Sequence, residues 1–323
     1  MATPEAAFYT CGDTLDHTPD ADRLTAEVIQ TSDGRAAVMV HDVLSGVKGA
    51  AQTEGIFLVQ KTTSMVFLDG GRVFWDHSAN KAHYKNVNDR DFFIGTAVGD
   101  ATSASTTMYV NLNVAQFNDI DVNRDGFLSV PTGTQVVGAF GHVKPYGGAR
   151  AFQLGATSEA QAIDLLSVDR FDKGANAIAE VIFRLGTNGT DSTVDLNFGI
   201  GNGTSTTDAD AVTEHVLFHI DGGTLTILAQ SKDGTTTVAA TTTSVSATAG
   251  SAVSDRIECW IDTRDLTSVK LYVNGAAVAT GSTFKLDAAT GPLGLLAHLE
   301  KTTGTATAGP VYIDRLVARL MQQ

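Results

Sequence analysis

The chain has 323 residues, of which 43% are hydrophobic and only 18% are charged, and its formal net charge is −14. The negative field would repel a phosphate backbone, so the composition argues against a nucleic-acid-binding protein. The first residues lack a basic segment followed by an apolar one, and no apolar run is long enough to span a bilayer. We therefore expect a soluble, cytoplasmically made protein with no membrane insertion, and the length favours two domains.

The N-terminal stretch YTCGDTLDHTP carries side chains that suit chemistry. It places Cys11, Asp13, Asp16 and His17 within a few residues. They suit three interpretations: metal ligands, a nucleophile with its base, or neither. The second cysteine, Cys259, is far away in sequence and no CxxC pair occurs, so the chain has neither a disulfide framework nor a zinc-ligand spacing.

Short apolar runs separated by turn residues follow along the first part of the chain. None of them has the 3.6-residue period of a helix. We expect a compact β domain over residues 1–116, of normal domain size. Its strands are predicted at residues 26–30, 35–40, 55–61, 65–68, 72–75, 92–98 and 106–112.

A polar, turn-rich segment, 117–132, is predicted to be a linker that ends near a proline. Within it, Asp121, Asn123 and Asp125 match positions 1, 3 and 5 of an EF-hand-type loop. Position 12 is Thr132 rather than the bidentate Glu of that motif. Two alternatives remain open: a weak calcium site, or an Asx-rich turn.

The second part, residues 133–323, shows clean alternation of apolar and polar residues. Many short alternating strands with regular turns indicate a β-sandwich, so the whole chain is predicted to be all-β. Asn274-Gly275 is a strong hairpin signal, and the Thr-rich segment 235–250 is interpreted as a polar edge strand with a loop. Strands are expected at 194–200, 216–220, 225–227, 257–261, 269–273, 276–279 and 311–320.

Templates for catalysis are not matched. EHVLFH places His215 and His219 four apart, but on a strand they are ~13 Å apart and cannot share one metal. Glu258 and Asp262 have the same spacing, whereas a retaining glycosidase needs its carboxyls about 5–5.5 Å apart. No phosphate-binding loop or nucleophile elbow occurs. We therefore expect no enzyme activity.

Four motifs of the first domain occur in an order that resembles a known family. They are GDTLDHTP, GIFLVQK, DGGRVFWD and FFIGTAVGDATSASTTMYVNL, at residues 12–19, 55–61, 69–76 and 92–112. In this order they resemble tailed-phage capsid decoration proteins of the DUF2190 type. The resemblance implies a small β-barrel or β-tulip-like domain that docks on the major capsid protein as a homotrimer.

The same resemblance implies that residues 1–24 are a docking arm and not an active site. An arm of this kind would add backbone hydrogen bonds to a capsid strand. The residues expected to make the docking contacts are Tyr9, Gly12, Asp13, Thr14, Leu15, Asp16, His17, Thr18 and Pro19.

The second domain resembles a different fold family. The segment SVKLYVNGAAVATG (268–281), preceded by DRIECWIDTRD (255–265), is similar to concanavalin A-like jelly rolls of the LamG type. The resemblance implies a sandwich that binds glycans or a host surface. Together the two resemblances predict a structural virion protein, assembled in the host cytoplasm, that stabilises the outside of a capsid. The alternative is a free-standing, lectin-like carbohydrate-binding module.

Overall fold

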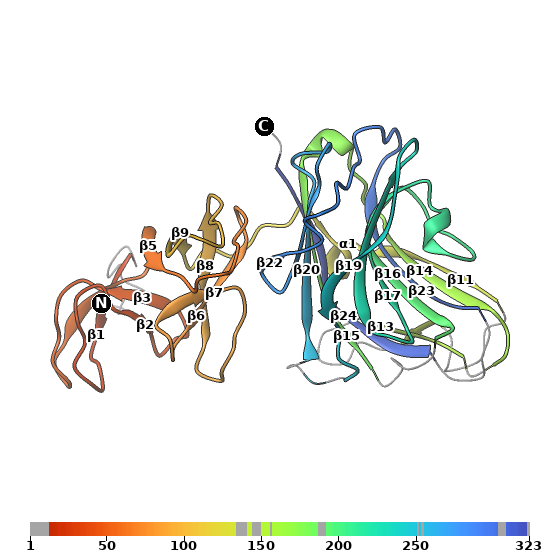
Figure 1. Ribbon diagram of the computed structural model, residues 1–323. Helices are drawn as coiled ribbons and strands as arrows, with labels where there is room; N and C mark the ends of the chain where they lie inside the picture. Colours follow the sequence, from red (N-terminus) through yellow and green to blue (C-terminus); the bar gives the residue numbers. More distant parts are fainter. Residues whose placement is uncertain are drawn as a thin grey trace, which may run out of the picture. The chain divides into compact units, whose positions relative to one another are not determined.

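The computed structural model describes residues 13–133, 141–143, 150–155, 157–186, 192–250, 252, 255–302 and 308–321. It divides into two compact units, Met1–Phe117 (unit 1) and Asn118–Gln323 (unit 2). Both units consist of antiparallel sheets with very little helix, which confirms the all-β class (Figure 1). No helix among the described residues is long and apolar enough to cross a membrane.

Unit 1 contains a small four-stranded sheet. Its apolar side chains form a cluster of their own, in which Ala37, Met39 and Ala51 are fully buried. The strands lie in the order β1 (Thr14–His17), β4 (Gly49–Gln52), β3 (Ala36–Met39) and β2 (Val28–Gln30).

The other sheet of unit 1 has five strands and closes on itself. Its order is β5 (Ile56–Gln60), β9 (Thr107–Leu112), β8 (Phe92–Val98), β6 (Arg72–Asp76) and β7 (Lys81–His83). Lys61, which follows β5, forms a parallel bridge with Ala82 of β7, so the first and last strands meet in a small barrel. The buried Lys61 ammonium donates to the carbonyl oxygens of Thr62 (3.1 Å) and Met65 (2.8 Å).

One asparagine joins the two sheets of unit 1. Asn113, directly after β9, has a left-handed backbone with φ of 58°. Its Oδ1 accepts a hydrogen bond from the Ala36 N–H (2.9 Å), and its Nδ2 donates to the carbonyls of Ala36 (2.8 Å) and Thr53 (2.7 Å). Asparagine tolerates this backbone conformation better than most residues. The side chain therefore fixes the end of β9 against the four-stranded sheet.

Unit 2 is a sandwich of two larger sheets, as the sequence predicted. The seven-stranded sheet has the order β11 (Phe127–Thr132), β14 (Gln161–Ser167), β23 (Gly294–Lys301), β16 (Val194–Gly201), β17 (Glu214–Asp221), β18 (Thr226–Asp233) and β19 (Thr237–Ser246). The eight-stranded sheet has the order β12 (Gly141–Val143), β13 (Arg150–Leu154), β24 (Ala308–Leu320), β15 (Ala177–Leu185), β20 (Ile257–Asp262), β21 (Lys270–Val273) and β22 (Ala276–Ala277), with β10 (Ile120–Asp121) beside β24.

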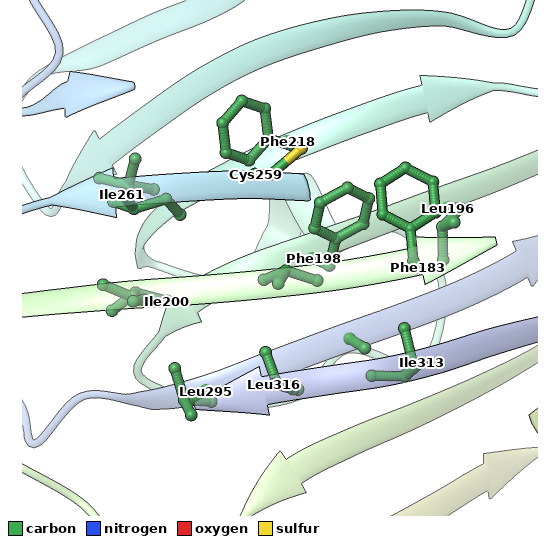
Figure 2. Packing of buried hydrophobic residues seen from close by; sticks show 14 of the residues in the cluster. Phe183, Leu196, Phe198, Ile200, Phe218, Cys259, Ile261, Leu295, Ile313 and Leu316 are labelled. Atoms are coloured by element: carbon green, nitrogen blue, oxygen red, sulfur yellow. The ribbon is translucent and has the colours of Figure 1, made fainter. Parts of the chain in front are cut away.

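The core of unit 2 lies between these sheets and is rich in aromatic and branched side chains (Figure 2). The ring of Phe198 lies 4.5 Å from that of Phe183 and 5.8 Å from that of Phe218, measured between centroids. Cys259 is fully buried in this core, and burial raises the pKa of its thiol well above the usual value. This cysteine is therefore a packing residue, whereas Cys11 lies outside the described residues.

The predicted linker at 117–132 is wrong, because most of it belongs to unit 2. Strand β10 pairs with β24, and β11 pairs with β14 over its whole length. Ile120 and Val122 enter the core of unit 2. The segment reads as polar because β11 is an edge strand whose side chains are only half-covered or exposed.

Most other predicted strands are confirmed. The Thr-rich segment forms β19 at the edge of its sheet, and the Asn274-Gly275 pair turns β21 into β22 with both residues at positive φ. The strand predicted at 65–68 is wrong, since Phe67 makes only an isolated bridge to Ala101.

A buried charged group ties β14 to β23 in unit 2. His298 is fully buried, and its Nδ1 lies 2.9 Å from Asp164 Oδ1 while its Nε2 lies 3.0 Å from Glu300 Oε2. Burial lowers the pKa of His298, but the hydrogen bonds and charges of Asp164 and Glu300 outweigh that effect and raise the pKa to about 9. The imidazole is therefore a buried cation between two carboxylates.

Replacing Asn113 should destabilise unit 1. Asn113→Ala removes three hydrogen bonds and leaves buried backbone groups unpaired, which should cost about 2–3 kcal/mol. The two tryptophans, Trp75 and Trp260, lie in different units. Urea unfolding followed by Trp75 fluorescence in a Trp260→Phe background measures this change. The exposed Asn88→Ala is the matched control, and an equal midpoint in both variants contradicts the prediction.

Unit 2 should lose stability in alkaline solution through His298. Because the folded-state pKa of about 9 lies above the usual 6.5, the stabilisation is complete below pH 6.5 and disappears as the pH rises through 9. A His298→Gln variant has no such titration, so its urea midpoint should change less over that range. Trp260 fluorescence in a Trp75→Phe background gives both midpoints, and identical pH profiles would rule the effect out.

Candidate functional site

The predicted docking residues are described from Asp13 to Pro19, whereas Tyr9 and Gly12 lie outside the described residues. Thr14–His17 form β1, which pairs with β4 in the register Thr14↔Gln52 to His17↔Gly49. The described part of the expected docking arm, residues 1–24, thus contains a strand of unit 1, and docking by these residues stays a prediction. Leu15 and His17 are half-buried while Thr14 and Asp16 are exposed. One face of β1 therefore packs against unit 1 and the other faces solvent.

Contacts around β1 hold it in place at both ends. The Asp13 carbonyl accepts from the Thr53 N–H (2.7 Å), and the carbonyl of buried Pro19 accepts from the Gly46 N–H (2.9 Å). The exposed Thr18 follows the strand. Since β1 is the end strand of its sheet, its outer edge has no partner strand among the described residues. Such an edge can accept a strand from another chain.

A row of exposed apolar side chains crosses the outside of the barrel. Leu58 on β5 lies opposite Tyr109 on β9, which lies opposite Val98 on β8. Together with Ile56 these residues are 37–60% exposed, and we call them the apolar stripe. Side chains of this size exposed together are typical of interaction surfaces. The sequence did not reveal the stripe, because GIFLVQK is apolar on both faces of the strand.

A groove of about 560 Å³ lies beside β5 in unit 1. Leu58 contributes to both the groove and the apolar stripe, and Leu24 adds a second exposed apolar side chain. The groove is lined by Leu24, Thr25, Ala26, Glu27, Val28, Val38, Phe57, Leu58, Val59, Gln60, Trp75 and Asn80. Unit 1 therefore presents an apolar surface at β5 and, on its four-stranded sheet, the outer edge of β1.

The geometry at the predicted calcium ligands agrees with the Asx-turn alternative and does not fit a cation. Oδ1 of Asp121 accepts from the Asn123 N–H (2.9 Å) at the start of the short helix α1 (Val122–Asp125). The Asp125 carboxylate accepts from the Asp121 N–H (2.7 Å) and pairs with Arg124 (2.6 Å). The Asn123 Oδ1 accepts from Arg150 Nε (3.2 Å). Two guanidinium groups therefore lie where calcium would need free oxygens.

The carboxylates and histidines that were tested against enzyme templates have local partners. Trp260 Nε1 donates to Glu258 Oε1 (2.8 Å), and Arg264 pairs with Asp262 (2.7 Å). His215 and His219 lie on β17, in a strand as predicted. Among the described residues no group of three His, Cys, Asp or Glu side chains is arranged to hold a metal ion.

A line of polar side chains crosses the face of the seven-stranded sheet that points away from the core. Asp164, His298, Asn197 and His219 are successive cross-strand neighbours on β14, β23, β16 and β17. Two residues along these strands, on the same face, Asp195 lies directly opposite both Glu300 and Asp221. We call these seven residues the polar row. Sequence reasoning missed it because only strand register brings residues from four distant segments together.

Within the polar row, the pKa of Asp195 is also shifted from its usual value. Burial raises the pKa of Asp195 to about 6; the nearby His219 opposes that shift, and Glu300, Asp221 and Asp208 add to it. His219 Nδ1 lies 2.9 Å from Asn197 Oδ1, and His219 Nε2 lies 3.9 Å from Asp195 Oδ1. The Asp195 carboxyl and the His219 imidazole therefore face each other, and a small polar group between them could hydrogen-bond to both.

Several solved structures are similar to this chain, with low identity and low TM-scores. The carbohydrate recognition domain of Emp46p, in its potassium-bound form, has a TM-score of 0.39 at 10% identity, covering 59% of this chain and 87% of that one. A protein of unknown function, SO2946 from Shewanella oneidensis MR-1, has 0.37 at 13%, covering 60% and 76%. Alginate lyase PA1167 from Pseudomonas aeruginosa has 0.38 at 11%, covering 55% and 84%. No curated protein matches the chain.

A family model gives the sharper result. Residues 9–112 match the model described as phage cement protein. The matched segment begins before β1 and ends with the last residue of β9, so it covers every described strand of unit 1 and none of unit 2. Unit 1, with its apolar stripe and open strand edge, is thus the part of the chain that resembles phage cement proteins.

Proposed function

We propose that this chain is a structural virion protein that binds the outside of a tailed-phage capsid and stabilises it. The observation that carries the proposal is the match of residues 9–112 to phage cement proteins, over all the described strands of unit 1. A protein that binds the assembled shell but not its free subunits stabilises the shell by mass action. This role needs binding surfaces and no reaction chemistry.

The surfaces of unit 1 suit this role in two ways. The outer edge of β1, within the expected docking arm, offers backbone groups to an extended segment of the major capsid protein. The apolar stripe offers Leu58 and Tyr109, which are 60% and 54% exposed, and burial of the exposed part of Leu58 would contribute about 1–2 kcal/mol. In a homotrimer, three copies of these surfaces would engage the shell together and gain avidity.

Unit 2 would remain at the virion surface and bind glycans or a host surface. The polar row supports this part of the proposal, because carboxylate, amide and imidazole groups on one sheet face suit hydrogen bonding to hydroxyl groups. The second candidate, a free-standing carbohydrate-binding module, rests on the same row and predicts glycan binding without capsid binding.

The capsid role is tested with purified heads assembled without this chain. The wild-type chain should cosediment with intact heads to a fixed stoichiometry and raise the temperature at which they release DNA. Leu58→Thr combined with Tyr109→Thr should weaken binding at least about tenfold, since 1.4 kcal/mol is enough for that factor. Threonine keeps strand propensity, so the barrel should stay folded.

A matched control removes exposed apolar side chains from unit 2. Leu128→Thr combined with Val168→Thr changes two residues that are as exposed as the stripe. This variant should bind heads as the wild type does. Heads that retain no wild-type chain would disprove the capsid role, and undiminished binding of the stripe variant would disprove the docking surface.

A further inference from the structure

The polar row of unit 2 is not needed for capsid docking by unit 1, yet it concentrates ionisable groups on one sheet face. One end of the row is accessible. The Asp195 side chain is 29% exposed and that of His219 is 16% exposed, whereas Asn197, His298 and Asp164 are fully buried. A ligand can therefore reach Asp195 and His219 from solvent, with the buried groups behind them.

The hydrogen bonds within the polar row leave Asp195 and His219 able to bind a ligand. Asn197 Oδ1 can only accept, so His219 carries its proton on Nδ1 and presents an acceptor at Nε2 when the ring is neutral. The 3.9 Å between His219 Nε2 and Asp195 Oδ1 is too long for a hydrogen bond. Each group can therefore bind a polar atom of a ligand placed between them.

Two buried atoms of the row give an independent indication of a ligand. Nδ2 of Asn197 and Oδ2 of Asp164 are buried and have no hydrogen-bond partner among the described residues. Each such atom costs about 1–3 kcal/mol while it is unpaired. They lie on β16 and β14 with β23 between them, so each needs a polar partner of its own.

The charge of the row limits the chemistry of the ligand. Asp164, Asp195, Asp221 and Glu300 share one face with His298 as the buried cation among them. An anionic ligand would meet net repulsion there. Leu228, half-buried and opposite His219 on β18, adds apolar surface beside the hydroxyl-binding groups. The combination suits a polyhydroxyl ring without negative charge.

We propose that the polar row is a binding site for uncharged glycans, in which Asp195 and His219 contact sugar hydroxyls and Asn197 positions the imidazole. The inference rests on the surface-binding role proposed for unit 2 and names its site and ligand class. It excludes uronates and sialylated glycans, because these would add a carboxylate to a face that already carries four.

The test uses the full chain on an array of oligosaccharides. The array carries uncharged oligomers of glucose, galactose, mannose and N-acetylglucosamine, together with oligogalacturonate and sialylated glycans. Uncharged oligomers should be retained and acidic ones should not. Titration calorimetry with the best uncharged oligomer should then show at least a tenfold loss of affinity for Asp195→Ala. Asp265→Ala, which removes an exposed carboxylate after β20, should bind as the wild type does.

A second readout does not depend on a variant folding. With histidine-labelled wild-type chain, the ring signals of His219 should move on saturation with that oligomer, while those of His83 in unit 1 should not. An array that retains nothing overturns both the surface-binding role and this site. Retention with unchanged affinity of Asp195→Ala, or with unmoved His219 signals, overturns the site alone. Neither result bears on capsid binding, which the same variants should keep.

Discussion

Strand register, set by the side chains that must enter a core, determines where the outward-facing groups of this protein lie. In unit 2 the rings of Phe198 and Phe218 are opposite neighbours that both point into the sandwich, so Asn197 and His219 must be opposite neighbours that point out of it. A slip of one residue would reverse both faces at once and is therefore strongly disfavoured. The polar row is a consequence of this packing, and the apolar stripe of unit 1 arises in the same way from Val59 and Met108 inside the barrel.

This constraint also explains which features the sequence could predict. Alternation along a single strand is local, so β16, β17 and the edge strand β19 were predictable from residue patterns alone. Register between strands is not local. Asp164 and His298 are 134 residues apart, and no spacing rule joins them before β14 and β23 are paired. The candidate site was missed for this reason, whereas the class of the fold was not.

Segments at sheet edges carry a weak sequence signal for strands. The segment after Phe117 looked like a linker and contained a calcium-like spacing of Asp121, Asn123 and Asp125. An edge strand buries only part of its side chains, so β11 lacks the apolar signal of a central strand. Side-chain oxygens that could bind calcium can equally accept the hydrogen bonds of an Asx turn. Here Arg124 donates to Asp125 and Arg150 donates to Asn123, which favours the turn over a calcium site. Composition within a short segment cannot reveal a partner that is distant in sequence.

Burying the charged side chains of His298, Asp164 and Glu300 costs desolvation free energy, and the fold of unit 2 does not need charges at these positions. Replacing buried ion-paired residues by apolar side chains often leaves the stability of a protein unchanged or raises it. The stability of unit 2 therefore does not explain why His298, Asp164 and Glu300 are buried together. If this sheet face only had to pack against covering segments, apolar side chains would stabilise it more than charged ones. Farther along the same face, Leu166, Leu217 and Leu296 form such an apolar cluster. The polar and apolar parts of this face thus differ although their strands are the same. We infer that the polar part serves recognition, since among the described residues of this face it combines buried unpaired atoms with the accessible groups of Asp195 and His219.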